Sequence, residues 1–174
     1  MDRIILQEVN EQYINGLEDF RNELILSGDL MEGCGDLKEL SARAWVARCL
    51  SIRNPATCPD GHVITTQFVC LRAKDQKLVG IIKVRHTLTE FLEKYVGHIG
   101  YSVRPSERRK GYGTQMLKAV LPYCKEIGLA RVLVCCMIGN SASQKTILSA
   151  GGIFEKQDYS PSEGIYLERY WIET

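Results

Sequence analysis

Apolar residues recur along the chain with two different periods, and each period predicts a type of secondary structure. Tyr13, Leu17, Phe20 and Leu24 follow one another at spacings of three and four residues, which indicates one apolar stripe of a helix. Residues 131–137 are apolar almost without interruption, as expected of a strand that is buried on both faces. Because segments of both kinds alternate, we expect a mixed α/β fold.

The same patterns predict about seven strands and about four longer helices over the whole chain. We expect strands at residues 3–9, 63–73, 78–85, 98–103, 131–137, 153–156 and 165–172. We expect helices at residues 13–27, at 37–47 with Asp36 as the N-cap, at 113–127 and at 140–150. Residues 51–62 fit an irregular segment, and residues 87–96 fit a short helix or a turn.

The composition is typical of a globular protein: of 174 residues, 45% are hydrophobic and 25% are charged. We therefore expect a single domain over residues 1–174. No apolar run approaches the ~20 residues that a membrane helix needs, and the first run is too short for a signal peptide. The net charge of +1 provides no strong field, so we expect neither nucleic acid nor a membrane as partner.

The seven cysteines are odd in number and form no CxxC pair, which favours reduced thiols in a cytoplasmic protein. The three histidines do not supply the second pair of close ligands that zinc needs, so we expect no metal.

Charge is nevertheless unevenly distributed. Residues 1–40 contain ten acidic and three basic residues, whereas residues 104–131 contain seven basic and two acidic ones. Either both segments are solvated surfaces, or the basic one binds an anion and the acidic one lies near a cation.

The clearest chemical signal is the segment VRPSERRKGYGT at residues 103–114, which joins the end of a strand to the start of a helix. Free N–H groups at a helix N-terminus bind phosphate oxygens, and the helix dipole strengthens the attraction. Gly111 and Gly113 lack the Cβ atoms that would hold a ligand away from those groups. Further positive charge comes from Arg108, Arg109 and Lys110. We predict a phosphate-binding loop.

Two well-known phosphate motifs are absent from this segment. It lacks the GxxxxGK[ST] of a Walker A loop, and it lacks the third glycine of a dinucleotide-binding GxGxxG. A nucleic-acid-binding module remains a remote alternative, because Tyr112 lies beside the basic cluster.

The run RRKGYG at residues 108–113 fits the signature R/Q-x-x-G-x-G/A, and the chain resembles the GNAT superfamily of acyl-CoA N-acyltransferases. The order of elements matches that family over nearly the whole chain. The segment GHIGYSVRP at residues 97–105 is similar to a group of bacterial predicted acetyltransferases. The resemblance implies a mostly antiparallel seven-stranded sheet, about four flanking helices, and a splayed cleft between the two central strands.

The resemblance also implies acetyl-CoA as cofactor, with its pyrophosphate on the N–H groups of the loop. Its pantetheine arm would pair with the strand at residues 101–103, and Asn140 would reach the arm or an ordered water. Asn140 also fits an ordinary helix cap, and both roles can coexist. The implied cofactor-binding residues are Tyr101, Ser102, Val103, Arg108, Arg109, Lys110, Gly111, Tyr112, Gly113, Thr114, Asn140 and Ser143.

The implied reaction moves an acetyl group to a primary amine and releases CoA. The acidic residues of the first 40 positions favour a small polycation, and a peptide or protein amine is the other option. The alternative is a CoA-binding protein that has lost turnover. Relatives are often dimers, so a homodimer is possible.

The proton-transfer residues stay open at this point. Many relatives have a tyrosine as general acid seven residues after the asparagine, where this chain has Ile147. Tyr166 and Tyr170 are possible replacements, although both fit packing roles.

His98 is the candidate general base, because it opens the cofactor strand and a histidine ordinarily titrates near pH ~6.5. Glu90 and Glu93 are weaker candidates. A structural role for His98 is the competing interpretation, and relay through ordered water would leave no trace in the sequence.

Overall fold

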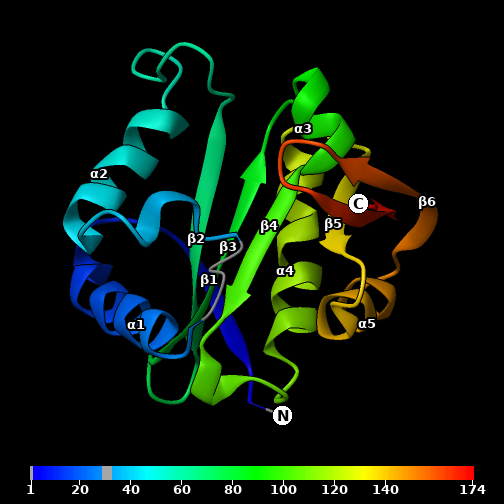
Figure 1. Ribbon diagram of the computed structural model, residues 1–174. Coiled ribbons are helices and arrows are strands. Elements are labelled where there is room, and N and C mark those ends of the chain that lie inside the picture. The colour runs from blue at the N-terminus through cyan, green and yellow to red at the C-terminus, as the bar shows by residue number, and fades with distance from the viewer. Residues whose placement is uncertain (1, 29–32) are drawn as a thin grey trace.

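The computed structural model describes residues 2–28 and 33–174, and within them seven strands form two antiparallel sheets (Figure 1). The first sheet has the order β1-β2-β3-β4 and the second has the order β5-β7-β6. The first contains β1 (Ile4–Glu8), β2 (Thr65–Arg72), β3 (Leu78–Arg85) and β4 (Ile99–Val103). The second contains β5 (Arg131–Met137), β6 (Ile153–Ser160) and β7 (Ile165–Glu173).

The α-helices of the described residues cover these sheets. They are α1 (Ile14–Leu26), α2 (Ala42–Arg53), α3 (Glu90–Tyr95), α4 (Tyr112–Glu126) and α5 (Ser141–Ser149). Figure 1 shows α1 and α2 on one face of the four-stranded sheet and α4 on the other. The predicted mixed, mostly antiparallel α/β fold is confirmed. In the described part of the chain, no helix is long and apolar enough to cross a membrane.

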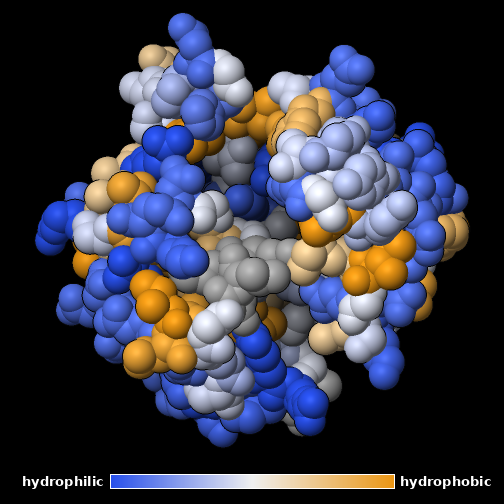
Figure 2. Space-filling view, in the orientation of Figure 1, coloured by the Kyte–Doolittle hydropathy of each residue, from blue (hydrophilic) through white to orange (hydrophobic). Residues whose placement is uncertain are grey.

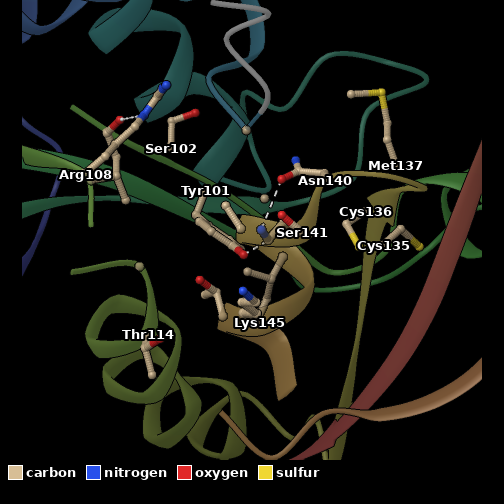
Figure 3. A pocket seen from close by; sticks show the side chains of 18 of the residues that line it. Tyr101, Ser102, Arg108, Thr114, Cys135, Cys136, Met137, Asn140, Ser141 and Lys145 are labelled. Atoms are coloured by element: carbon tan, nitrogen blue, oxygen red, sulfur yellow. Dashed lines mark hydrogen bonds between the residues drawn. The ribbon is translucent and has the colours of Figure 1, made fainter. Parts of the chain in front are cut away.

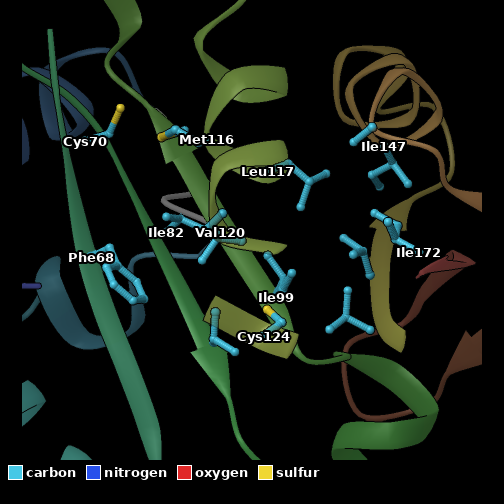
Figure 4. Close-up of a cluster of buried hydrophobic side chains, with 14 of the residues drawn as sticks. Phe68, Cys70, Ile82, Ile99, Met116, Leu117, Val120, Cys124, Ile147 and Ile172 are labelled. Atoms are coloured by element: carbon cyan, nitrogen blue, oxygen red, sulfur yellow. The ribbon is translucent and has the colours of Figure 1, made fainter. Parts of the chain in front are cut away.

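Two apolar cores lie on the two faces of the first sheet. Under α1 and α2, the predicted stripe of Leu17, Phe20 and Leu24 is fully buried against residues such as Ile81 of β3. The other core lies around α4 and reaches β5, β7 and α5, as Figure 4 shows. Ile147 of α5 is fully buried in that core, which explains why an apolar residue occupies this position.

Helix α2 begins later than the sequence predicts. The Oγ atom of Ser41 accepts a hydrogen bond from the N–H of Ala44 at 3.3 Å, so Ser41 is the N-cap and the prediction of Asp36 is wrong. Asp36 instead lies in a short 3-10 turn and forms an ion pair with Arg48 of α2, at 2.6 Å. Apolar spacing continued through this turn, which is why the pattern placed the helix start too early.

The C-terminal strands also differ from the prediction in length. Strand β6 extends to Ser160 rather than ending at 156, because it pairs with β7 as far as Ile165. This outer strand is largely exposed, so its later residues carry no apolar run that marks them as a strand.

Candidate active site

The two sheets meet at one end of β4 and separate along it. At Gly97 and His98, an isolated bridge reaches Val134, and the N–H of His98 donates to the carbonyl of Leu133 at 2.7 Å. Gly97 has a φ of +82°, and a Cβ there would overlap the Leu133 carbonyl. Beyond this contact β4 and β5 diverge. Their separation divides the expected seven-stranded sheet in two and opens a cleft.

The cleft has a cavity volume of about 1070 Å³. Its walls include β4, the end of β3, the last residues of β5, the loop before α4 and the first turns of α4 and α5. Figure 2 shows the hollow in this face of the molecule, between the side that carries α1 and α2 and the side that carries β5 to β7. Among the predicted cofactor-binding residues, the lining includes Tyr101, Ser102, Val103, Arg108, Arg109, Gly111, Tyr112, Gly113, Thr114, Asn140 and Ser143.

The loop before α4 presents backbone N–H groups as its sequence predicts. Gly111 is the N-cap of α4 with a left-handed φ of +79°, and it makes no side-chain cap. Within the described chain, the N–H groups of residues 109–114 have no recorded backbone or side-chain acceptor. Free N–H groups in a wide cleft at the start of a 15-residue helix suit an anion. The residues present therefore fit the pyrophosphate of a CoA-type cofactor.

The three predicted cationic side chains of the loop have different surroundings. The Nε atom of Arg108 donates to the carbonyl of Val103 at 3.2 Å (Figure 3). The Nζ atom of Lys110 contacts Glu107 at 2.8 Å, and Lys110 is the one predicted cofactor-binding residue that does not line the cleft. Arg109 is exposed at the lining of the cleft. Tyr112 contributes to the wall, but its side chain is 2% exposed and belongs to the core.

Glu107 anchors this loop, and sequence reasoning did not identify it. Its side chain is 4% exposed and contacts Arg72 at 3.0 Å and Lys77 and Lys110 at 2.8 Å each. Burial acts to raise the pKa of Glu107, but hydrogen bonds from Lys110 and Lys77 and the nearby positive charges lower it to about 2. Two of its partners come from the β2–β3 hairpin, which no local motif places beside the loop.

Arg104, counted among the basic residues of this region, is part of the fold. Its Nε atom donates to the carbonyl of Leu78 at 2.7 Å, and its Nη1 atom forms an ion pair with Glu23 of α1 at 3.0 Å. This side chain is 8% exposed, and Arg104 does not line the cleft. It joins α1 to β4 rather than binding a ligand.

Two hydroxyl groups meet across the cleft. The Oη atom of Tyr101 on β4 lies 2.9 Å from the Oγ atom of Ser143 on α5. Asn140 caps α5, because its Oδ1 atom accepts the N–H of Ser143 at 3.1 Å, which confirms the cap that the sequence predicts. Figure 3 shows Tyr101 pointing toward the first turn of α5, where Asn140 and Ser141 lie. The cap thus fixes Ser143 where Tyr101 can reach it.

The candidate tyrosine acids of β7 do not line the cleft. Tyr170 is 2% exposed in the core, where its hydroxyl donates to Glu168 at 2.6 Å. Tyr166 is 61% exposed and lies against the ring of Tyr159. Both contacts support packing roles. A further carboxylate of the lining, Glu163 between β6 and β7, was not found from the sequence, because no motif surrounds it.

His98 lies at the junction of the sheets rather than in the wall of the cleft. Its Nδ1 atom accepts the N–H of Leu133 at 2.9 Å, and the residue is 8% exposed. Burial, followed by the positive charge of Arg85, lowers the pKa of His98 to about 4. An acceptor nitrogen that holds the two sheets together favours the structural role over the catalytic one. Glu90 and Glu93 lie in the first turn of α3, outside the lining of the cleft.

We expect His98→Ala to destabilise the protein and to leave the pH profile of activity unchanged. Truncation leaves the buried N–H of Leu133 without its acceptor, which costs ~1–3 kcal/mol of unfolding free energy. Since the folded pKa is below the ordinary value, the wild type loses stability as pH falls from about 6.5 toward 4. The variant lacks this loss. Denaturant unfolding of both proteins at pH 7 and pH 5 measures the stability, and kcat/KM against pH measures the activity profile. If the wild type shows a basic limb near pH 6–7 that is missing in the variant, His98 is catalytic after all.

A family model described as an acetyltransferase (GNAT) domain matches residues 3–153 of the chain. No curated protein sequence matches the chain. A ribosomal-protein-S5-alanine acetyltransferase from Vibrio fischeri is similar in structure, with a TM-score of 0.72 and 14% identity over 99% of this chain and 94% of that one.

Two further solved structures have the same fold. A ribosomal L7/L12 alpha-N-protein acetyltransferase, solved with coenzyme A, gives a TM-score of 0.72 and 14% identity over 98% of this chain and 93% of that one. A spermidine N-acetyltransferase chimera, made from a Vibrio cholerae protein and hSSAT, gives a TM-score of 0.66 and 12% identity over 98% of this chain and 95% of that one. The family model covers most of the chain, so the chain belongs to the acetyltransferase (GNAT) domain family, the family of acetyl-CoA-dependent N-acetyltransferases.

Proposed function

We propose that this protein transfers the acetyl group of acetyl-CoA to a primary amine in the cleft between β4 and β5. One observation carries the proposal: a turn with unpaired N–H groups opens into the same cavity as the outer edge of β4. The first suits a pyrophosphate, and the second suits an extended amide-containing arm. A bound acetyl-CoA supplies an activated acetyl thioester.

The residues of the cleft divide into three tasks in this proposal. The N–H groups of residues 109–114, with Arg108 and Arg109 beside them, hold the phosphates. Residues 101–103, on the edge strand of their sheet, orient the arm. Asn140 fixes the start of α5, so that its first turn forms the opposite wall.

Tyr101 and Ser143 supply the proton for the departing thiolate. Ile147 is buried in the core and offers no hydroxyl, and the tyrosines of β7 lie outside the cleft. The hydroxyls of Tyr101 and Ser143 both line the cleft and are hydrogen-bonded to each other at 2.9 Å. Such a pair can donate from one hydroxyl while the other orients it. The proton of the amine passes to water in the open cleft.

The similar structures do not indicate which amine is the acceptor. They are named for acceptors as different as ribosomal proteins and spermidine. The acidic residues that favoured a polycation are largely engaged elsewhere. Glu18 contacts Arg21, Glu23 contacts Arg104 and Asp36 contacts Arg48. Asp29 and Glu32 lie outside the described residues. These three acids thus give a polycation little support.

Release of free thiol from acetyl-CoA with a panel of amines tests the proposal. We expect CoA release that depends on the amine, together with a rise in melting temperature on adding acetyl-CoA. At 100-fold excess over Kd, a ligand of the native state adds ~2.7 kcal/mol of stability. A rise in melting temperature without release with any amine indicates the alternative, a CoA-binding protein without turnover.

A further inference from the structure

A second cavity of about 470 Å³ opens beside the large cleft, and we call it the side pocket. It lies between α2, the last residues of β3, the segment 61–65 and the start of α3. Lys83 and Arg85 line both cavities. The side pocket therefore joins the large cleft at these two cations.

Lys83 and Arg85 continue a face of β3 that is otherwise apolar. Side chains alternate along a strand, so Ile81, Lys83 and Arg85 point to the same face. Ile81 is fully buried under α1 and α2, whereas the two cations lie where that cover gives way to the side pocket. Gly100, the partner of Lys83 on β4, leaves room for the lysine, because a Cβ there would lie 3.3 Å from its Cε atom.

The ammonium group of Lys83 has no recorded hydrogen bond or ion pair with the described residues. Burial, followed by the charge of Arg85, lowers the pKa of Lys83 to about 8. Such a shift is the sign of a charged group that is short of compensating partners. Arg85 donates from Nη1 to the carbonyl of Gly97 at 3.0 Å and contacts no carboxylate among the described residues.

The lining of the side pocket does not neutralise these two charges. Asp36 is the one acidic residue among its described members, and it already contacts Arg48 at 2.6 Å. An anion bound between Lys83 and Arg85 would supply the missing charge. Trp45, Ile52 and Phe91 supply apolar surface to the same pocket, as is usual for a small-molecule site.

The two cations also lie at the end of the large cleft that is far from the loop before α4, where an acceptor would meet the end of the cofactor arm. Val103 adjoins the phosphate-binding loop, and Gly100 pairs with Lys83. At ~3.4 Å per residue, about 10 Å of β4 separates these two points. A cofactor arm that begins at the loop and follows β4 thus ends near Lys83, where the side pocket opens.

We propose that the acceptor is an amine that also carries a carboxylate, such as an amino acid, and that Lys83 and Arg85 bind this carboxylate in the side pocket. The inference rests on the proposed function and names the substrate class for it. The carboxylate fixes the acceptor so that its amine faces the large cleft. A polycation such as spermidine would instead be repelled by the same two charges.

Calorimetric titration of the common amino acids, each beside its carboxamide, tests this in the absence and presence of CoA. We expect at least one acid to bind, and its carboxamide to bind at least ~10-fold more weakly because the charge is gone. Lys83→Gln should weaken binding of the acid by a similar factor and leave the Kd for acetyl-CoA unchanged. Lys83→Arg should restore binding, and Lys118→Gln, on the exposed face of α4, is the matched control.

Three results would overturn the inference: no acid binds the wild type, the carboxamide binds as well as the acid, or Lys83→Gln binds the acid normally. If spermidine is acetylated faster than every acid, the inference is wrong while the proposed function stands. If the wild type fails to bind acetyl-CoA at all, the proposed function itself is wrong. Melting temperatures of both Lys83 variants show whether any loss of binding reflects misfolding.

Discussion

Gly111→Asp is expected to abolish useful binding of acetyl-CoA while the protein stays folded. The loss should reach at least about 100-fold in Kd, or about 2.7 kcal/mol, because a carboxylate would occupy and repel the phosphate site. The fold should tolerate the change. Asp is one of the few side chains found at left-handed φ values such as the +79° of Gly111, and a negative charge is favourable at a helix N-terminus.

Gly111→Asn is the matched control, because it has the same shape without the charge. We expect it to weaken binding far less than Gly111→Asp. Gly113→Asp should also weaken binding, although its Cβ would lie 3.3 Å from the Oγ1 atom of Thr146, so some of its effect will come from packing of α4 on α5. Calorimetry gives Kd and thermal melts report the fold. Normal acetyl-CoA binding by Gly111→Asp would mean that this loop does not hold the pyrophosphate.

The second large effect is expected at the hydroxyl pair of the cleft. Tyr101→Phe and Ser143→Ala should each lower kcat by ~10²-fold, the usual contribution of a positioned proton donor. The Kd for acetyl-CoA should change little, because the loop is untouched. If the two hydroxyls act as one unit, the double variant should be hardly slower than the worse single one.

Steady-state kinetics of the two single variants and the double variant measure this coupling. Ile147→Tyr is not a suitable rescue, because Ile147 is fully buried and a larger side chain there would overpack the core. Two single variants with wild-type kcat would show that the proton comes from another group, such as water.

Much of the fold and the geometry of the loop before α4 could be predicted, because their signals are local. The stripe of α1 and the apolar run of β5 determine which faces are buried, and both predictions are confirmed. The loop combines glycines with a helix start within a few residues, so one short segment contains its whole chemistry.

Long-range contacts explain what the sequence did not reveal. In the sequence, Glu107 is one acidic residue in a basic segment. In the fold, the β2–β3 hairpin places Arg72 and Lys77 against it. Lys83 has no motif around it in the sequence, and only the fold places it in one cavity with α2 and the segment 61–65. His98 was a reasonable candidate base, because only the structure shows that its ring nitrogen accepts the N–H of Leu133.

The central claim, that acetyl-CoA lies between β4 and β5 on the loop before α4, is tested most directly by hydrogen–deuterium exchange with and without acetyl-CoA. Because the N–H groups of residues 109–114 have no recorded acceptor in the described chain, we predict strong protection there on binding, with weaker protection at residues 101–103. Gly111→Asp should show no such protection at the same concentration. Tight binding of acetyl-CoA with unchanged exchange at residues 109–114 would contradict the claim.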